Sequence, residues 1–271
     1  MDYTVETGDV AIGATRMYWE AGGGGGVPLI VAHGGFGTAG ALAPLCARLA
    51  SRRRVIAIEL QGHGHTPDAD RPLRFESLAD DIAAALDGLG IARADLWGYS
   101  FGGGACLRAA IQHPTRVRRL VVVSFPCRCD GWLPDVAAQM ASFGADTADT
   151  LRQTPLYAAW RAVAPEPEAF DGVVGKMGDL LGRPYDWSEA VRGLAMPVLV
   201  VVADADSVAP GHAAEFFGLL GGGRQDAGWD GSRRPASRLA ILPGRTHYDV
   251  WSAPELADIT DAFLDAEDAD A

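Results

Sequence analysis

One serine stands among glycines in the segment GYSFG (98–102), which fits the pattern Gly-x-Ser-x-Gly. An apolar, strand-like run precedes Ser100 and a helix-like run follows it. In a tight turn between strand and helix, the hydroxyl projects above the sheet, and flanking residues without side chains relieve the crowding. Ser100 is therefore a candidate nucleophile, although the pattern also arises by chance in a chain with 34 glycines and serine is common at helix starts.

A nucleophilic serine needs partners, because a hydroxyl is weakly nucleophilic near neutral pH. The partners are a histidine that takes the proton and a carboxylate that orients the histidine, in the chain order Ser, acid, His. His247 follows the apolar run 237–244, and two aspartates follow the apolar run 196–203. The carboxyl ends of parallel strands meet at one edge of a sheet, where such sheets bind ligands. This set of residues predicts acyl transfer.

The two aspartates, Asp204 and Asp206, differ in their position relative to the next helix. Side chains alternate along a strand, so periodicity alone does not distinguish them. Pro210 is expected to begin the next helix, which leaves Asp206 in the loop above the sheet and within reach of His247. We therefore predict that Asp206 orients the histidine, and we expect Asp204 to bond backbone N–H groups that shape the loop.

Acyl transfer also requires N–H donors for the oxyanion that forms during attack. The glycine-rich segment HGGFG (33–37) follows the apolar run that starts at Val27 and offers backbone N–H groups. The Phe101 N–H, next to Ser100, is predicted to be the second donor.

The elements that must position these residues alternate along the chain. Continuous apolar runs, typical of strands covered on both faces, occupy the segments 27–33, 54–60, 94–100, 117–125, 196–203 and 237–244. Helical patterns lie between them, as in 77–90, and Pro254 stands where another helix begins. This alternation predicts an α/β fold with a mostly parallel central sheet flanked by helices. We interpret the glycine run 22–26 as the connection of a hairpin.

Residues 127–193 interrupt this alternation. They contain no strand candidate but carry many aromatic side chains in short helical stretches. We interpret them as a helical lid inserted into a core formed by residues 1–126 and 194–271. Most of the aromatic side chains are expected to pack in the core, and a minority to face a substrate. The candidates for the substrate pocket are Phe36, Trp132, Trp160 and Trp187.

Taken together, the motifs resemble those of the α/β-hydrolase fold family. The segments that carry the resemblance are the HG-x turn at 33–37, the GHG-x-S-like loop GHGHT at 62–66, the D-x-x-x-P acid loop at 206–210 and the P-G-x-x-H turn at 243–247. Ala203 departs from the glycine that the family usually has before the acid loop. The resemblance implies a triad of Ser100, Asp206 and His247, with the Gly35 N–H as an oxyanion donor and Phe36 as the open alternative.

The resemblance implies a serine hydrolase that cleaves a carboxylic ester, lactone or thioester through an acyl-enzyme on Ser100. Dehalogenases and epoxide hydrolases of the same fold do not fit, because they use aspartate at this position. Two alternatives remain open. The same triad serves cofactor-free perhydrolases or haloperoxidases and hydrolases of carbon–carbon bonds, and some relatives only bind small molecules. We expect no cofactor.

The composition and charge of the chain argue against several other classes of function. A chain of 271 residues, 48% of them hydrophobic, is able to bury a large core. The net charge of −12 argues against a nucleic-acid or anionic-membrane partner, because both would be repelled. The four cysteines match neither a zinc spacing nor a disulfide framework, so no metal is predicted. Without a signal-peptide pattern or a membrane-length apolar run, we expect a cytoplasmic protein whose partner is a small-molecule substrate.

Most of the remaining histidines have simpler interpretations. His33 is expected to fix the oxyanion turn through hydrogen bonds, and His63 and His65 are expected to lie in a loop. His212 follows a proline at a helix start and is expected to be exposed.

Overall fold

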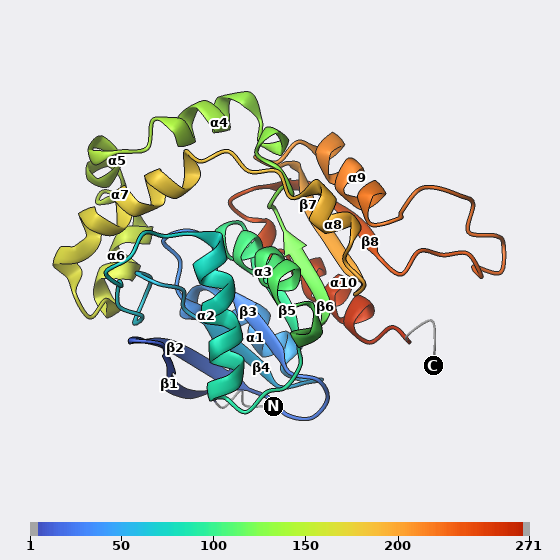
Figure 1. Ribbon diagram of the computed structural model, residues 1–271, viewed down its shortest axis with the longest axis horizontal. Coiled ribbons are helices and arrows are strands. Elements are labelled where there is room, and N and C mark those ends of the chain that lie inside the picture. The colour runs from blue at the N-terminus through green and yellow to red at the C-terminus, as the bar shows by residue number, and fades with distance from the viewer. Residues whose placement is uncertain (1–4, 268–271) are drawn as a thin grey trace.

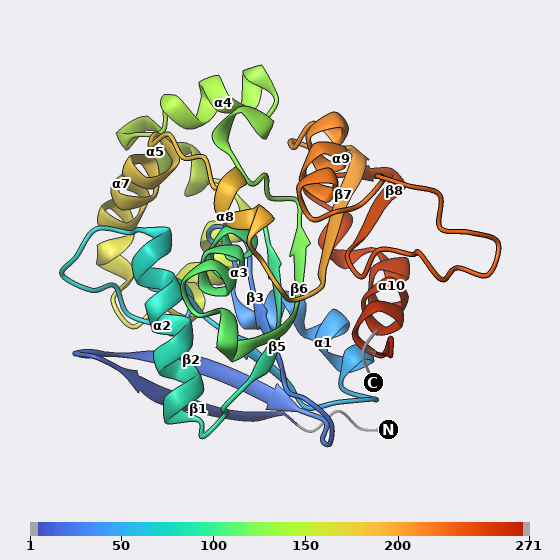
Figure 2. The same cartoon turned by 45° about the vertical axis from the view of Figure 1, so that its right-hand side comes forward.

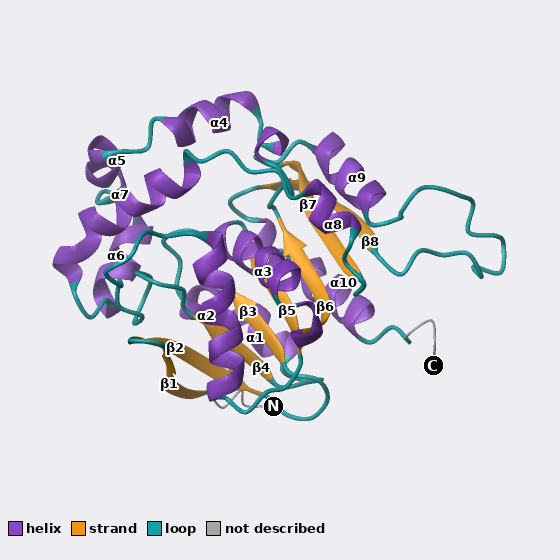
Figure 3. Ribbon diagram, in the orientation of Figure 1, coloured by secondary structure: helices purple, strands orange, loops and turns teal. Residues whose placement is uncertain are grey.

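The centre of the molecule is a sheet with the strand order β1-β2-β4-β3-β5-β6-β7-β8 (Figure 1 and Figure 3). The computed structural model describes residues 5–267. The strands in this part of the chain are β1 Glu6–Ile12, β2 Thr15–Gly22, β3 Leu29–Ala32, β4 Val55–Ile58, β5 Ala94–Tyr99, β6 Val117–Val123, β7 Val198–Ala205 and β8 Arg238–Thr246. The strands β4, β3, β5, β6, β7 and β8 pair in parallel in that order, which confirms the predicted mostly parallel sheet.

Helices cover both faces of this sheet. The longer helices are α1 Ala43–Leu49, α2 Phe75–Gly88, α3 Phe101–Gln112, α4 Pro134–Ala141, α5 Ala145–Leu151, α6 Pro155–Val163, α7 Phe170–Leu181, α8 Ser188–Arg192, α9 Pro210–Leu219 and α10 Pro254–Leu264. Short 3-10 helices are η1 Ala39–Leu42, η2 Pro114–Arg116, η3 Cys129–Gly131, η4 Pro167–Ala169 and η5 Val250–Ser252. Helices α2 and α3 pack on one face of the sheet and α1 and α10 on the other, and Figure 2 shows the second pair on the right of the molecule.

The apolar runs in the interior of the sheet form strands that are buried on both faces. All four residues of β3 are buried, with Ile30 and Ala32 in the core on one face and Leu29 and Val31 in the core on the other. The core on the first face includes side chains of α2 and α3, and the second includes side chains of α1 and α10. Parallel strands sandwiched between helices read as continuous apolar runs for this reason.

The amino-terminal hairpin was not predicted from the sequence. Strands β1 and β2 pair antiparallel, with Ile12 opposite Thr15, and β2 pairs antiparallel with β4. The prediction that residues 22–26 connect a hairpin is wrong. The hairpin turn lies at Gly13–Ala14, whereas the glycine run leads from β2 to β3, and these two strands are not neighbours in the sheet.

The segment between β6 and β7 holds the helices α4 to α8. In Figure 1 the helices α4 to α7 arch over the end of the sheet toward which the arrow of β6 points. Near the two ends of this segment, Arg128 and Asp186 form an antiparallel β-bridge. Its description as a lid stays a prediction. None of the helices within residues 5–267 has the length and hydropathy of a membrane span.

Candidate active site

Ser100 lies in a sharp turn between β5 and α3. Its backbone has φ 50° and ψ −120°, which is a strained conformation for a residue with a side chain. Two glycines make the turn possible. A Cβ atom at Gly98 would lie 2.2 Å from the Gly102 carbonyl oxygen, and one at Gly102 would lie 2.5 Å from the Ala32 carbonyl oxygen. The sequence therefore has glycine where any side chain would overlap backbone.

Three side chains from three strand ends form one hydrogen-bonded series. His247 follows β8 and Asp206 follows β7. The Ser100 Oγ lies 3.1 Å from His247 Nε2, and His247 Nδ1 lies 2.8 Å from Asp206 Oδ1. With the proton on Nδ1, the imidazole donates to the carboxylate and its Nε2 accepts from the serine hydroxyl. His247 is 9% exposed and Asp206 is 4% exposed, so little water competes for these bonds.

The Asp206 carboxylate accepts four hydrogen bonds. Besides His247, Oδ1 accepts from the Val208 N–H at 3.2 Å, and Oδ2 accepts from the Ser124 hydroxyl at 2.5 Å and the Ala203 N–H at 2.9 Å. Burial pushes the pKa of Asp206 upward. The hydrogen bond and charge of His247, together with the Ser124 and Ala203 donors, outweigh burial and hold this pKa below its ordinary value. Asp206 is therefore ionised around neutral pH.

Asp204 has a different position and a different partner. It lies within β7, is exposed, and accepts a hydrogen bond of 2.9 Å from the Gly244 N–H in β8. The contacts of the two aspartates agree with the expected division, in which Asp206 reaches His247 and Asp204 bonds backbone.

The glycine-rich turn after β3 lies against Ser100. A Cβ atom at Gly34 would be 3.6 Å from the Ser100 Cβ. His33 holds the turn, because its Nδ1–H donates to the Gly34 carbonyl at 2.7 Å and its Nε2 accepts from the Leu60 N–H at 3.1 Å. Burial, with a smaller contribution from His63, lowers the pKa of His33 to about 3, so the ring stays neutral and keeps both bonds.

Gly35 and Phe101, the two predicted oxyanion donors, are neighbours. A Cβ atom at Gly35 would lie 4.0 Å from the Phe101 Cβ and 3.8 Å from the Met177 methyl group. Phe101 is the first residue of α3, where a backbone N–H has no acceptor within its own helix. Phe36, the alternative donor, has a positive φ of 57° and a buried ring.

The three candidate tryptophans lie in different surroundings. The Trp132 ring meets the His247 ring edge-on, with centroids 6.0 Å apart. The Trp160 indole donates to the Gly62 carbonyl at 3.0 Å. Trp187 packs at right angles on Phe75, with centroids 5.5 Å apart. The structure thus places Trp132 beside the triad, whereas the contacts described for Trp160 and Trp187 join the segment 127–193 to the rest of the molecule.

Sequence reasoning missed three residues at the site. Ser124 bonds Asp206, the Tyr99 hydroxyl donates to the His247 carbonyl at 2.6 Å, and Met177 of α7 lies over Gly35. The rule that pointed to Asp206, a polar residue at the end of an apolar strand, also applies to Ser124. No comparable signal marks Met177, because one apolar residue on an amphipathic helix looks like another.

Two other histidines are fully or largely buried. His63 stacks on Phe101, with centroids 5.1 Å apart, and burial lowers its pKa to about 4. The expectation that His212 is exposed is wrong. It is 5% exposed, and its Nε2 accepts from the Cys127 N–H at 3.2 Å, because the first turn of α9 packs against Gly131.

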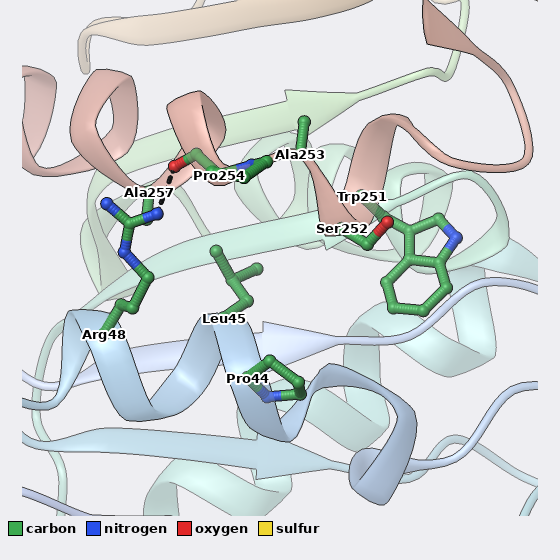
Figure 4. A pocket seen from close by; sticks show the side chains of 8 residues that line it. All are labelled: Pro44, Leu45, Arg48, Trp251, Ser252, Ala253, Pro254 and Ala257. Carbon is green, nitrogen blue, oxygen red and sulfur yellow. Dashed lines mark hydrogen bonds between the residues drawn. The ribbon is translucent and has the colours of Figure 1, made fainter.

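The described residues form no candidate metal site, and one groove lies apart from the predicted site residues. Within residues 5–267, no three His, Cys, Asp or Glu side chains are grouped so that they could hold a metal ion. A groove of about 180 Å³ lies between α1 and the start of α10, where Leu45, Trp251 and Pro254 line it (Figure 4). The described residues that line this groove include none of the predicted site residues.

Comparison with known proteins identifies the fold. Residues 27–159, which include Ser100 but neither Asp206 nor His247, match the family model described as alpha/beta hydrolase fold. A carboxylesterase from Bacillus subtilis has a similar structure, with a TM-score of 0.75 and 20% identity over 98% of this chain and 94% of that one. The chain has the α/β-hydrolase fold, as its motifs predicted.

Two relatives match part of the chain more closely. The dihydrolipoyllysine-residue acetyltransferase component of the acetoin cleaving system of Pseudomonas putida is 38% identical over 114 residues, which cover 42% of this chain. The 2-hydroxymuconate semialdehyde hydrolase of Pseudomonas sp. (strain CF600) is 43% identical over 112 residues, which cover 38% of this chain. These matches span only 31% and 40% of the relatives' own lengths.

Proposed function

We propose that the protein is a serine hydrolase that cleaves a small-molecule carboxylic ester, lactone or thioester through an acyl-enzyme on Ser100. The observation that carries this proposal is the hydrogen-bonded series from the Ser100 hydroxyl through His247 to the ionised Asp206. A serine in a strained turn, touching an imidazole nitrogen whose ring bonds a carboxylate through its other nitrogen, is arranged for nucleophilic attack.

In the first step, the Ser100 oxygen bonds to the carbonyl carbon while its proton passes to Nε2 of His247. The carbonyl electron pair moves onto the oxygen, where the N–H groups of Gly35 and Phe101 stabilise it. The bond to the alcohol or thiol then breaks, and the leaving group takes the proton from Nε2. Asp206 stabilises the imidazolium that exists between these two proton transfers.

Water completes the reaction by the same route. His247 accepts a proton from the water as the water oxygen bonds to the acyl carbon. The bond between the acyl carbon and the Ser100 oxygen then breaks, and the Ser100 oxygen takes that proton from His247. The products are a carboxylic acid and free enzyme.

The side chains around the triad favour an apolar acyl group. Trp132 lies against His247, Met177 lies over Gly35, and the Phe36 ring stacks near Phe143 at 6.2 Å. Three of these side chains, Trp132, Met177 and Phe143, come from residues 127–193, which we propose act as a lid that encloses the substrate. A carboxylate on the acyl chain would lose its hydration against these apolar groups.

Substitution of the nucleophile tests the proposal. Ser100→Ala is expected to lower kcat for an activated acetate ester by at least about 10³-fold and to abolish labelling by a fluorophosphonate. The matched control is Ser207→Ala, which removes a buried hydroxyl from the same region of the molecule and should leave both readouts unchanged. Retained turnover or labelling in Ser100→Ala would contradict the proposal. A wild-type protein that does not react would instead indicate a binding protein.

An ester series tests the apolar acyl pocket. The wild-type enzyme is expected to prefer p-nitrophenyl butyrate over the hemisuccinate ester, which has a similar length but ends in a carboxylate. Trp132→Ala should change this preference more than it changes acetate hydrolysis, whereas Trp160→Ala should chiefly lower the melting temperature. A preference for the hemisuccinate would contradict the apolar pocket but not the nucleophile.

Hydrolysis of a carbon–carbon bond is the second candidate. The similarity to a 2-hydroxymuconate semialdehyde hydrolase favours it, although that similarity covers 40% of the relative. A kcat/KM for 2-hydroxymuconate semialdehyde above that for every ester in the series would select this candidate. Assays with added peroxide would identify perhydrolase or haloperoxidase activity.

A further inference from the structure

Two serines at the ends of neighbouring strands share an unusual backbone conformation. Ser100 follows β5 with φ 50°, and Ser124 follows β6 with φ 54°. Each donates its N–H to the next strand in the sheet, Ser100 to the Val123 carbonyl and Ser124 to the Val201 carbonyl, both at 2.8 Å. A positive φ is disfavoured for residues other than glycine and is found where the surroundings enforce it. The turn of the nucleophile explains Ser100, whereas Ser124 requires its own explanation.

The Ser124 side chain makes one close polar contact. Ser124 is fully buried, and its hydroxyl donates to Asp206 Oδ2 at 2.5 Å. The direction of this bond is fixed, because an ionised carboxylate has no proton to donate. Apart from His247, Ser124 is the residue whose side chain bonds this carboxylate; the other two donors are backbone N–H groups.

We propose that Ser124 is a positioning residue that holds the Asp206 carboxylate in the orientation in which Oδ1 faces the Nδ1–H of His247. This inference rests on the proposed function, because it assigns Ser124 a part in the same acyl transfer. The carboxylate rotates about a bond with a broad torsional preference, so its orientation depends on what each oxygen bonds. Ser124 and the Ala203 N–H hold Oδ2, and that leaves Oδ1 for the histidine.

Removal of the hydroxyl is the first test. Ser124→Ala is expected to lower kcat by about tenfold, a typical cost for one hydrogen bond to a charged group, while KM changes by less than about twofold. Ser207→Ala is the matched control, because it truncates a buried serine next to Asp206 and should leave kcat unchanged. Should Ser124→Ala not fold, Ser124→Gly removes the same hydroxyl and suits the positive φ.

A double-mutant cycle separates positioning from a structural role. If Ser124 acts through the carboxylate, then Ser124→Ala should lower kcat by less than about twofold in the background of Asp206→Asn. A structural role predicts the same fall in both backgrounds. An unchanged kcat for Ser124→Ala in the otherwise wild-type chain, or equal falls in both backgrounds, would overturn the proposal.

A proton resonance tests the same coupling without any substrate. The Nδ1 proton of His247 is expected to give a low-field NMR signal that shifts or broadens in Ser124→Ala and stays in place in Ser207→Ala. An unchanged signal in Ser124→Ala would overturn the positioning role. This readout does not depend on Ser100 being the nucleophile, so failure of the proposed function and failure of this inference are distinguishable.

Discussion

At the scale of single residues, the molecule gives two aspartates that are two positions apart different partners. Asp206 lies past the end of β7, where its carboxylate meets His247, while Asp204 is still in the strand and bonds the backbone of β8. The two residues carry the same functional group, so the difference comes from their positions: Asp204 is exposed within the strand, whereas Asp206 is buried beyond its end.

The first prediction follows from this difference. Asp206→Asn is expected to lower kcat by about 10²–10⁴-fold, because the amide does not stabilise the imidazolium. Asp204→Ala should keep nearly full turnover and lose about 1 kcal/mol of unfolding free energy through the lost bond to Gly244. Turnover numbers and urea denaturation of both variants provide the measurement. An inactive but stably folded Asp204→Ala would show that the acid has been assigned wrongly.

The site residues that could be predicted from the sequence are those that carry a reactive group at a recognisable position. Ser100, Asp206 and His247 combine a reactive group with a place at a strand end, and the structure brings them together. Ser124 has the same signature in a weaker form, since a serine after a strand is common. His212 was expected to be exposed because its helix starts with a proline, but the packing of that helix start against Gly131 is a tertiary contact that no local pattern contains.

At the scale of elements, the geometry of Ser100 depends on how closely α3 approaches the sheet. Gly98 at the end of β5 touches the backbone of Gly102 in α3, and Gly102 in turn touches the end of β3. The strand, the turn and the helix therefore form a unit in which backbone packs on backbone without side chains between them.

The second prediction concerns this contact. Gly98→Ala and Gly102→Ala are expected to cost more than about 3 kcal/mol of unfolding free energy or to prevent folding, because the added methyl group overlaps backbone atoms that cannot move aside. Gly172→Ala is the matched control. It lies in α7 with no atom within 4 Å of the added Cβ, so the higher helix propensity of alanine should leave stability unchanged or raise it by up to about 1 kcal/mol. Urea denaturation measures all three variants, and equal effects would contradict the close contact.

The elements that the sequence predicted are those with one simple pattern. All six strands predicted from continuous apolar runs are present, and five of them are largely buried, whereas the edge strand β8 is mostly exposed or half-buried. The hairpin β1–β2 was missed because β1 is largely exposed and β2 is only partly buried, so neither forms a continuous apolar run. The pairing of β2 with β4 joins segments that are far apart in the sequence, and it produces no recognisable pattern in the sequence of either strand.

At the scale of the whole molecule, buried neutral histidines couple stability to pH. Burial lowers the pKa of His33 to about 3 and that of His63 to about 4. Unfolding exposes both rings and returns each pKa to its ordinary value near 6.5. Between these values the unfolded chain binds more protons than the folded chain, so these histidines lower the unfolding free energy as the pH falls below about 6.5.

The third prediction isolates His63. In His63→Phe, the fall of the unfolding free energy between pH 6 and pH 4.5 should be less steep than in the wild type by about 1.4 kcal/mol per pH unit, because one titrating group is removed. Phe75→Leu changes a buried residue that does not titrate, so it should lower the unfolding free energy by the same amount at every pH. Urea denaturation across this pH range provides the measurement, and parallel curves for His63→Phe and the wild type would contradict a neutral buried His63.

The position of β8 has a consequence for how activity is gained and lost. Within residues 5–267 this strand forms one edge of the sheet and pairs with β7 alone, whereas the strands that precede Ser100 and Asp206 lie in the interior of the sheet. Edge elements open in local fluctuations that leave the interior folded. We therefore expect His247 to separate from Ser100 and Asp206 under mild denaturing conditions before the interior strands unfold. A molecule in which β8 has detached would hold the Ser100 hydroxyl without the histidine beside it, so the proposed activity requires this strand to be docked.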